Sequence, residues 1–327
     1  MSEPVLLVAD IGGTNARFAL ANTQTTGFRD EMTLPCERYP GIDKAIRAYF
    51  DRIGSPAPSI MCLAVAGPII NQQVQLTNNP WFIAAQDLER QMGCKKVQLI
   101  NDFTAIALSL PFLADDECMT IGPNLAANSG QDLHGRYGVV GPGTGLGIAG
   151  LIKNAGQYIP ITTEAGHMGF APETPQQIEL LKTLRQRWPR VSSERLLSGS
   201  GIENIYWALN HDSDLPEASL NAAEIFEQAI KQRSSMARRA VSLFFEVLGQ
   251  VAGGIALAFG AESGIYIAGG MVKRYPELLA DSQFRAAFES KGRHRILMER
   301  IPTRLILHPQ PGLLGASYQV QQLVHNL

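Results

Sequence analysis

Three segments of this 327-residue chain combine small residues with a carboxylate in a way that suits phosphate chemistry. Asn101 and Asp102 directly follow the apolar run 97–100, which predicts a buried strand that ends at an acid. Glycine-rich turns lie far upstream at 10–15 and downstream at 141–147. Because open α/β sheets bind ligands at the carboxyl ends of their strands, one lone acid and two phosphate-sized loops predict phosphoryl transfer.

The first turn has few side chains that would keep its backbone N–H groups away from a phosphate: Gly12, Gly13, Thr14 and Asn15. Asp10, at the end of the preceding strand, is a candidate for holding Mg²⁺ through water, since magnesium keeps much of its hydration shell. The alternative is a plain Gly-Gly hairpin turn that Asp10 caps.

The second turn, 141–147, alternates four glycines with other residues. It fails the GxGxxG pattern in both registers, and the chain has no GxxxxGK[ST] motif, which disfavours a dinucleotide fold and a Walker-type NTPase. We expect an anion-binding hairpin in which Thr144 and Gly145, beside Gly143, face the donor phosphates. A flexible lid loop is the alternative.

Asp102 is the candidate general base. Phosphoryl transfer to an alcohol needs the hydroxyl oriented in line and its proton accepted late, which one positioned carboxylate can do. Asn101 beside it can fix the substrate. Asp102 as the N-cap of a helix predicted at 103–110 is an alternative that is compatible with this role.

Three further polar residues suit the hydroxyl groups of a polyol. Glu164 and His167 share a glycine-containing loop, although an ordinary surface loop explains them equally. Glu194 follows two serines at a position where an acid stabilises a helix N-terminus, so helix capping is its alternative.

The elements that must position these residues alternate between strand and helix, which indicates an α/β fold. Strands are predicted at 5–9, 16–21, 60–65, 97–100, 137–140, 148–152, 264–268 and 304–307. Helices are predicted at 42–53, 84–92, 103–110, over much of 174–260, and after 312. Both halves open with strand, glycine loop, strand, which indicates an internal duplication.

Bulk composition favours small-molecule chemistry. Lys and Arg number 28 against 30 Asp and Glu, so a net charge of −2 gives no electrostatic reason to expect a nucleic acid or membrane partner. The four cysteines are too far apart for CxxC chemistry and are expected as free thiols in a reducing cytoplasm. The six histidines show no zinc-binding spacing. The N-terminus lacks the pattern of a signal peptide, and the apolar stretch 240–261 is predicted to be a buried helix.

Eight segments together extend the pattern over nearly the whole chain: 10–17, 76–81, 101–105, 141–147, 164–167, 193–195, 268–270 and 311–315. In this order they resemble the bacterial-type glucokinase family, ATP-dependent hexose kinases of the actin-like ATPase fold. The resemblance implies transfer of phosphate from ATP-Mg²⁺ to the 6-hydroxyl of glucose, with Asp102 as the base.

The resemblance also implies the binding residues. The sugar hydroxyls would contact Asn101, Asp102, Glu164, His167 and Glu194. The ATP phosphates would contact Gly12, Gly13, Thr14, Thr144 and Gly145, and Gly269 with Gly270 would lie near the adenosine.

The implied architecture is a two-lobed actin-like ATPase (ribonuclease H-like) fold with a duplicated βββαβαβα core and a central cleft. A small lobe would comprise 1–112 plus 313–327, and a large lobe 113–312. Closure of the lobes on the sugar would exclude water. A cytoplasmic homodimer is the expected form.

Two departures from the family pattern stand out. Ala165 replaces a glycine that many relatives carry, so its Cβ is expected to restrict the loop of Glu164 and His167. Lys273 stands where relatives often carry proline. Three alternatives stay open: a kinase for mannose, glucosamine or fructose, a non-catalytic sugar sensor, and a phosphatase or polyphosphate hydrolase on the same fold.

Overall fold

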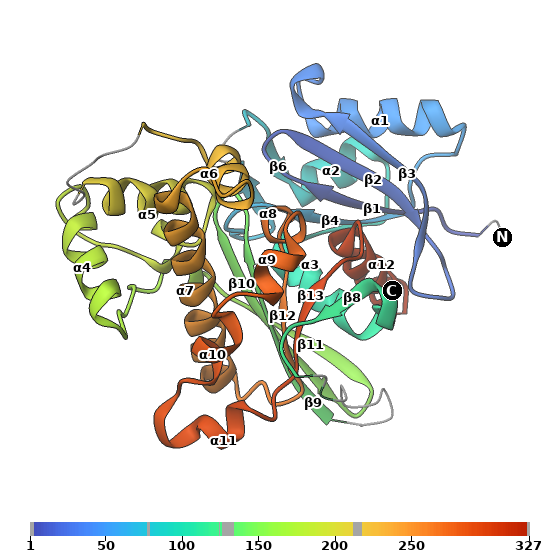
Figure 1. Cartoon of the computed structure of the whole chain (residues 1–327). Helices are drawn as coiled ribbons and strands as arrows, with labels where there is room; N and C mark the ends of the chain where they lie inside the picture. The colour runs from blue at the N-terminus through green and yellow to red at the C-terminus, as the bar shows by residue number, and fades with distance from the viewer. Residues whose placement is uncertain (1–2, 77–78, 124, 126–133, 212–217, 326–327) are drawn as a thin grey trace. The chain divides into compact units, whose positions relative to one another are not determined.

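The computed structural model describes residues 3–76, 79–123, 125, 134–211 and 218–325, and the chain divides into two compact units (Figure 1). Unit 1 comprises Met1–Ala114, Tyr158–Thr162 and His308–Leu327. Unit 2 comprises Asp115–Gln157 and Thr163–Leu307.

Unit 1 contains a five-stranded sheet in the order β3-β2-β1-β4-β7. The strands are Phe28–Pro35, Asn15–Ala21, Leu6–Ile11, Ile60–Val65 and Lys96–Asn101. β1 and β2 form the predicted antiparallel hairpin, whereas β1, β4 and β7 run parallel. All six residues of β4 are buried, as expected for a parallel strand that is covered on both faces. The register aligns Ile11, Val65 and Asn101, so three parallel strands end at the same edge of the sheet.

Helices cover both faces of this sheet. On one face, α1 (Ile42–Ile53) and α2 (Ala85–Met92) share a core with alternate residues of the strands. On the other face, α12 (Pro311–His325) packs against β1, β4 and α3 (Asp102–Ser109) (Figure 1). A short sheet of β5 (Gln73–Gln75) and β6 (Phe82–Ala84) completes the unit.

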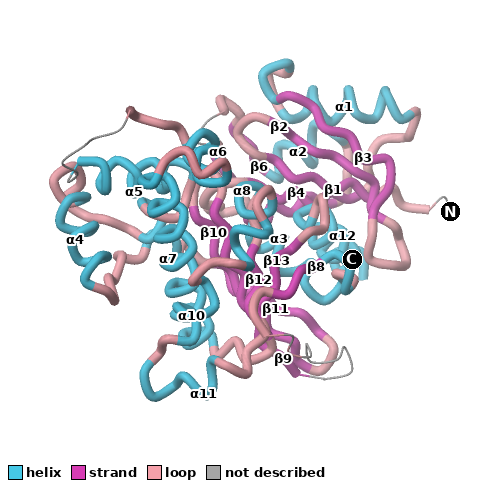
Figure 2. Tube along the Cα trace, viewed as in Figure 1, coloured by secondary structure: helices cyan, strands magenta, loops and turns pink. Residues whose placement is uncertain are grey.

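The second sheet has six strands in the order β11-β10-β9-β12-β13-β8, drawn in magenta in Figure 2; five of them belong to unit 2, whereas residues 158–162 of the edge strand β11 are assigned to unit 1. The strands are Gln157–Thr162, Leu146–Asn154, His134–Pro142, Gly264–Ile267, Thr303–Ile306 and Cys118–Thr120. β9 and β10 form the second predicted hairpin, and β12 runs parallel to both β9 and β13. Both glycine turns of the sequence therefore connect antiparallel strands.

Helices make up most of the core of unit 2. They are α4 (Pro175–Leu184), α5 (Gly199–His211), α6 (Ala222–Ile230), α7 (Ser235–Phe259), α8 (Gly270–Lys273), α9 (Pro276–Ala280), α10 (Phe284–Glu289) and α11 (Arg295–Met298). α7 is long and apolar enough to cross a membrane, but 72% of its most apolar window is buried, and it packs against α5, α6 and α10. It is a core helix, as predicted for the stretch 240–261.

Candidate functional site

The first glycine turn closes the β1–β2 hairpin, with a hydrogen bond from Gly12 N to Asn15 O of 3.0 Å. Asp10 lies on β1 directly opposite Arg17 on β2, and the guanidinium Nη1 is 3.3 Å from the Asp10 Oδ2. Burial raises the pKa of Asp10, and Arg17 offsets that shift only in part. Among the described residues no N–H group of the turn donates to the Asp10 carboxylate, which instead forms an ion pair across the hairpin.

Asn101 and Asp102 lie at the junction of β7 and α3. The Asn101 Oδ1 accepts hydrogen bonds from the N–H groups of Phe103 (2.9 Å) and Thr104 (3.2 Å), so Asn101 is the N-cap of α3. Asp102 is the first helical residue, and its Oδ1 accepts from the Phe103 N–H at 2.8 Å. The prediction that Asp102 caps this helix is wrong, because the amide before it has the extended backbone that an N-cap requires.

The ends of β1 and β7 place the first turn and Asp102 on the same edge of the unit 1 sheet. Gly12 follows Ile11, Asp102 follows Asn101, and the register aligns these two strand ends through Val65 of β4. Because neighbouring strands lie about 4.8 Å apart, one intervening strand separates the two strand ends by roughly 10 Å. An acid and a run of glycine N–H groups thus share one rigid edge.

Gln72 supports this edge, and nothing in the sequence reasoning pointed to it. Its side-chain amide donates to Leu99 O (3.2 Å) and accepts from Leu99 N (2.8 Å). These two hydrogen bonds occupy the free edge of β7 two residues before Asn101. Gln72 has a φ of 58°, a conformation that is costly for a residue with a side chain. The only sequence signal is its position between the apolar strand β4 and β5.

The second glycine turn lies between β9 and β10. Gly143 N donates to Gly145 O at 2.8 Å, and Gly199 N donates to Gly143 O at 2.9 Å. The Glu194 Oε2 accepts a hydrogen bond of 3.0 Å from Leu146 N. A Cβ on Gly145 would lie 2.5 Å from that same oxygen, so any side chain there would displace the Glu194 carboxylate.

Glu194 is therefore a partner of the glycine turn. It belongs to the 3₁₀ turn Ser193–Arg195, which forms no side-chain cap hydrogen bond. Glu194 lies in the first turn of this 3₁₀ helix, where an acid is favourable, as the capping alternative expected, but its carboxylate makes its hydrogen bond with a strand 48 residues away. The other carboxylate oxygen, Oε1, is 3.8 Å from His167 Nδ1.

The loop of Glu164 and His167 contacts the start of β10. His167 N donates to Glu164 O at 3.0 Å, which closes the 3₁₀ turn Ala165–His167. A Cβ on Gly166 would overlap the carbonyl oxygen of Leu146, so glycine at this position permits the close contact between the loop and β10. The sequence had not singled out Gly166 for this role. Ala165 is not among the residues with positive φ, so its methyl group strains no backbone; that it restricts this loop stays a prediction.

Gly269 and Gly270 follow β12 and begin α8. Gly269 has a φ of 102°, and a Cβ there would overlap the carbonyl oxygen of Pro142 at the end of β9. Unit 2 therefore brings together the second glycine turn, Glu194, His167 and the Gly269–Gly270 pair. Unit 1 brings together Asp10, the first glycine turn, Asn101 and Asp102.

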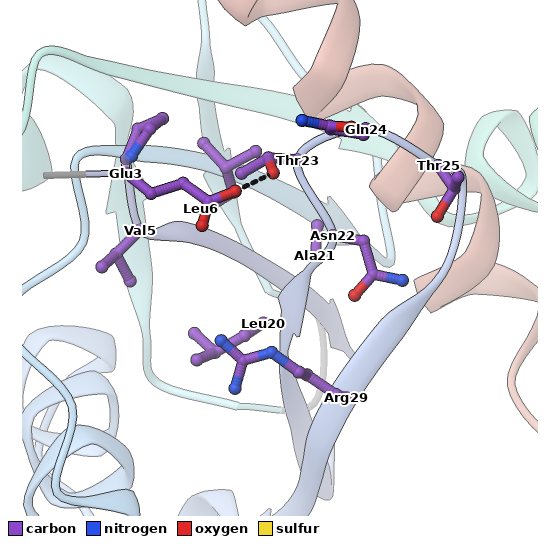
Figure 3. A pocket seen from close by; sticks show the side chains of 11 residues that line it. Glu3, Val5, Leu6, Leu20, Ala21, Asn22, Thr23, Gln24, Thr25 and Arg29 are labelled. Atoms are coloured by element: carbon purple, nitrogen blue, oxygen red, sulfur yellow. Dashed lines mark hydrogen bonds between the residues drawn. The ribbon is translucent and has the colours of Figure 1, made fainter.

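A pocket of about 360 Å³ lies elsewhere in unit 1. Figure 3 shows it between the N-terminal segment and the end of β2, where Thr23 donates a hydrogen bond to the Glu3 carboxylate. None of the predicted site residues line this pocket. Within the part of the chain that the structure describes, no three His, Cys, Asp or Glu side chains gather as a metal-binding cluster.

Comparison with known proteins identifies the family. The family model described as Glucokinase matches residues 7–323. The chain belongs to the glucokinase family. It is 40% identical over 326 residues to the glucokinase of Chromohalobacter salexigens, covering 100% of this chain and 99% of that one. It is 38% identical over 322 residues to the glucokinase of Tolumonas auensis, with 98% of each chain covered.

Solved structures agree with this membership of the glucokinase family. The crystal structure of a glucokinase from an Antarctic psychrotroph is 32% identical, has a TM-score of 0.88, and is covered over 100% of both chains. A glucokinase of the ROK family from Streptomyces griseus, solved with glucose and AMPPNP, has a TM-score of 0.63 at 19% identity, with 97% of this chain and 99% of that chain covered. The second likeness concerns the mixed α/β fold alone. The resemblance seen in the sequence is confirmed.

Proposed function

We propose that this chain is a glucokinase that transfers the γ-phosphoryl group of ATP to the 6-hydroxyl of D-glucose, giving glucose 6-phosphate and ADP. One observation carries the proposal: the parallel ends of β1 and β7 hold a glycine turn and the carboxylate of Asp102 at one edge of the same sheet. Membership of the glucokinase family supplies the substrates that such an edge serves.

Asp102 is the general base of the proposed mechanism. It accepts the proton of the 6-hydroxyl as the bond from the γ-phosphorus to the sugar oxygen forms and the bond to the leaving oxygen of ADP breaks. Its position in the first turn of α3 fixes the carboxylate direction, because the Phe103 N–H already binds Oδ1. The Asn101 Oδ1 already accepts the two hydrogen bonds of the helix cap, so its Nδ2 is the group that contacts the sugar.

Glu164, His167 and Glu194 provide the other proposed sugar contacts. Carboxylates accept hydrogen bonds from sugar hydroxyls, and the imidazole can donate or accept. The Glu194 Oε2 is engaged by the Leu146 N–H, which directs Oε1 toward His167. A fixed carboxylate of this kind discriminates between hexoses because a hydroxyl in the wrong orientation leaves it unpaired.

The glycine turns are the proposed phosphate sites. In unit 1 these residues are Gly12, Gly13, Thr14 and Asn15; in unit 2 they are Gly143, Thr144 and Gly145, with Gly269 and Gly270 near the adenosine. The absence of side chains at 143 and 145 fits an anion, because no Cβ atoms at these positions shield the Thr144 and Gly145 N–H groups; the Gly143 N–H already binds Gly145 O.

Asp10 is the proposed anchor for Mg²⁺, through a water molecule. The fit is chemical. Burial raises the pKa of Asp10, and Arg17 offsets that shift only in part. A nearby cation would therefore stabilise the charged carboxylate. When bound, Mg²⁺ neutralises charge on the transferring phosphates.

The remaining features of the proposal concern the whole protein. Each of the two sheets contains an antiparallel hairpin whose first strand runs parallel to a later strand. This common pattern supports a duplicated actin-like core. We place the small lobe at 1–112 plus 313–327 and the large lobe at 113–312. Free cysteines at 36, 62, 94 and 118 suit a cytoplasmic enzyme, and a homodimer is the proposed assembly.

The variant Asp102→Asn tests the base. We expect kcat for glucose phosphorylation to fall by about 10²–10⁴-fold, because an amide cannot accept the hydroxyl proton. The glucose Kd, measured by isothermal titration, should change by less than about threefold, since the amide keeps one hydrogen-bonding oxygen. The control is Asp51→Asn on the exposed side of α1, which should leave kcat unchanged.

The unmutated protein is assayed beside both variants with ATP-Mg²⁺ and glucose, mannose, glucosamine or fructose. Glucose 6-phosphate as the main product supports the proposal. Glucose binding without turnover in the unmutated protein would contradict the proposal and indicate a sensor. A higher kcat/KM with another hexose would show that this hexose, rather than glucose, is the preferred substrate.

A further inference from the structure

Three successive carbonyl groups of the first glycine turn are held by residues outside the turn. The Gly12 carbonyl accepts from the Cys36 thiol (Sγ to O 3.7 Å), and the Gly13 carbonyl accepts from the Asn79 Nδ2 at 3.3 Å. The Thr14 carbonyl accepts from Cys36 N at 2.9 Å. All of these partners belong to unit 1.

Fixing a carbonyl also fixes the N–H group of the next residue. The described chain contains no cis peptide bond, and in a trans peptide the C=O and N–H vectors point in opposite directions. The N–H groups of Gly13 and Thr14 are therefore directed away from Cys36 and Asn79. Among the described residues, none accepts a hydrogen bond from these two N–H groups, which leaves them for a ligand.

Asn79 is itself rigidly held. It is 8% exposed, and its Oδ1 accepts a hydrogen bond of 2.9 Å from Trp81 N while its Nδ2 donates to the turn. The Trp81 indole donates to Tyr39 O at 3.0 Å, and Tyr39 N donates to Cys36 O at 3.1 Å. The two residues that hold the turn thus belong to one connected network.

The Cys36 thiol can donate at neutral pH. Its side chain is 3% exposed, and burial raises its pKa above the ordinary value, so the proton stays on sulfur. A thiol is a weak donor, and the amide of Asn79 is the stronger of the two clamps.

We infer that Asn79, assisted by Cys36, is a positioning residue that aims the N–H groups of Gly13 and Thr14 at the phosphates of the nucleotide. This inference rests on the proposed kinase function. It assigns a role in phosphate binding to a residue 66 positions from the turn, in a segment that follows β5. Asn79 itself need not touch the nucleotide.

The variant Asn79→Asp isolates this role. Aspartate keeps an oxygen for the Trp81 N–H but cannot donate to the Gly13 carbonyl. We expect the Kd for AMPPNP with Mg²⁺, measured by isothermal titration, to rise by about tenfold, the equivalent of one lost hydrogen bond. The glucose Kd should stay within about twofold. Asn79→Ala, which adds no charge, should raise the AMPPNP Kd at least as much, and Cys36→Ala should raise it less.

Gln75→Ala is the matched control. The Gln75 Nε2 donates to the carbonyls of Leu76, Asn79 and Trp81, so its loss loosens the same segment without touching the turn. We expect a lowered Tm and an unchanged AMPPNP Kd. Amide resonances of Gly13 and Thr14 should shift on addition of AMPPNP in the unmutated protein, and shift less in Asn79→Asp.

The outcomes separate the inference from the proposed function. Wild-type AMPPNP affinity in both Asn79 variants overturns the inference, and so does an equal loss of affinity in Gln75→Ala. An unmutated protein that forms no glucose 6-phosphate overturns the proposed function. In that case an AMPPNP affinity that still depends on Asn79 supports the positioning role on its own.

Discussion

At the scale of single residues, the carboxylate of Glu194 decides the shape of the unit 2 site. Its Oε2 fills the space that a Cβ on Gly145 would need and binds the Leu146 N–H. Its Oε1 lies 3.8 Å from His167 Nδ1. A glycine proposed to bind phosphate and an acid proposed to bind sugar are therefore adjacent, and a side chain at 145 would move the acid.

Gly145→Ala should damage the proposed sugar site although the substitution lies in the glycine turn. The added Cβ would displace the Glu194 carboxylate, and we expect the glucose Kd to rise by about tenfold or more through the loss of one charge-assisted hydrogen bond. The measurement is isothermal titration with glucose. Gly169→Ala is the control, because a Cβ there meets no atom within 4 Å. A normal glucose Kd in Gly145→Ala would show that Glu194 moves freely.

At the scale of elements, two glycines of α7 have opposite roles. Gly249 lies against α10, where a Cβ would overlap the carbonyl oxygen of Phe284. Gly254, five residues later on the same helix, is exposed, and a Cβ there meets nothing within 4 Å. α7 therefore approaches α10 closely at Gly249. At the exposed Gly254 the helix is less stable than it would be with alanine, since glycine is a poor helix former.

The paired variants Gly249→Ala and Gly254→Ala should change stability in opposite directions. We expect Gly249→Ala to lower the free energy of unfolding by about 1–3 kcal/mol through overpacking. Gly254→Ala should raise it by about 0.5–1 kcal/mol, because alanine loses less backbone entropy in a helix. Urea denaturation of both variants gives the comparison. Equal changes of the same sign would show that α7 and α10 do not pack as described.

At the scale of the whole molecule, the last helix belongs to the same unit as the first strand. The last helix, α12, packs against β1, β4 and α3, so the core of unit 1 is incomplete until the C-terminal residues are present. Gly315 makes the approach to α3 possible, because a Cβ there would overlap the carbonyl oxygen of Ala105. A Cβ on Gly312 of the same helix would lie 3.3 Å from the Asp10 Cγ.

Gly315→Ala should therefore loosen unit 1 selectively. We expect faster hydrogen exchange of backbone amides in β1, β4 and α3, and unchanged exchange in α7 of unit 2, as read by mass spectrometry. Gly249→Ala is the reciprocal control, with faster exchange in α7 and α10 only. An equal loss of protection in both units after either substitution would contradict their division into separate cooperative parts.

The sequence by itself determined the local features and the family. Apolar strand segments on either side of Gly-rich turns predicted both hairpins, and the apolar run 97–100 predicted β7, because these signals depend only on near neighbours. Eight ordered segments were enough to indicate a glucokinase, which the family match confirmed. The roles of the individual site residues stay predictions.

Only the tertiary structure decided which residues support those features. Strand β11, the Gln72 clamp on β7, the bond from Asn79 to Gly13, and the direction of Glu194 toward Leu146 left no pattern that could be recognised in the sequence. Each of the last three joins residues 27 to 66 positions apart. Local periodicity carries no information over such separations. The choice of Asn101 over Asp102 as the cap likewise depended on where β7 ends, which packing against β4 sets.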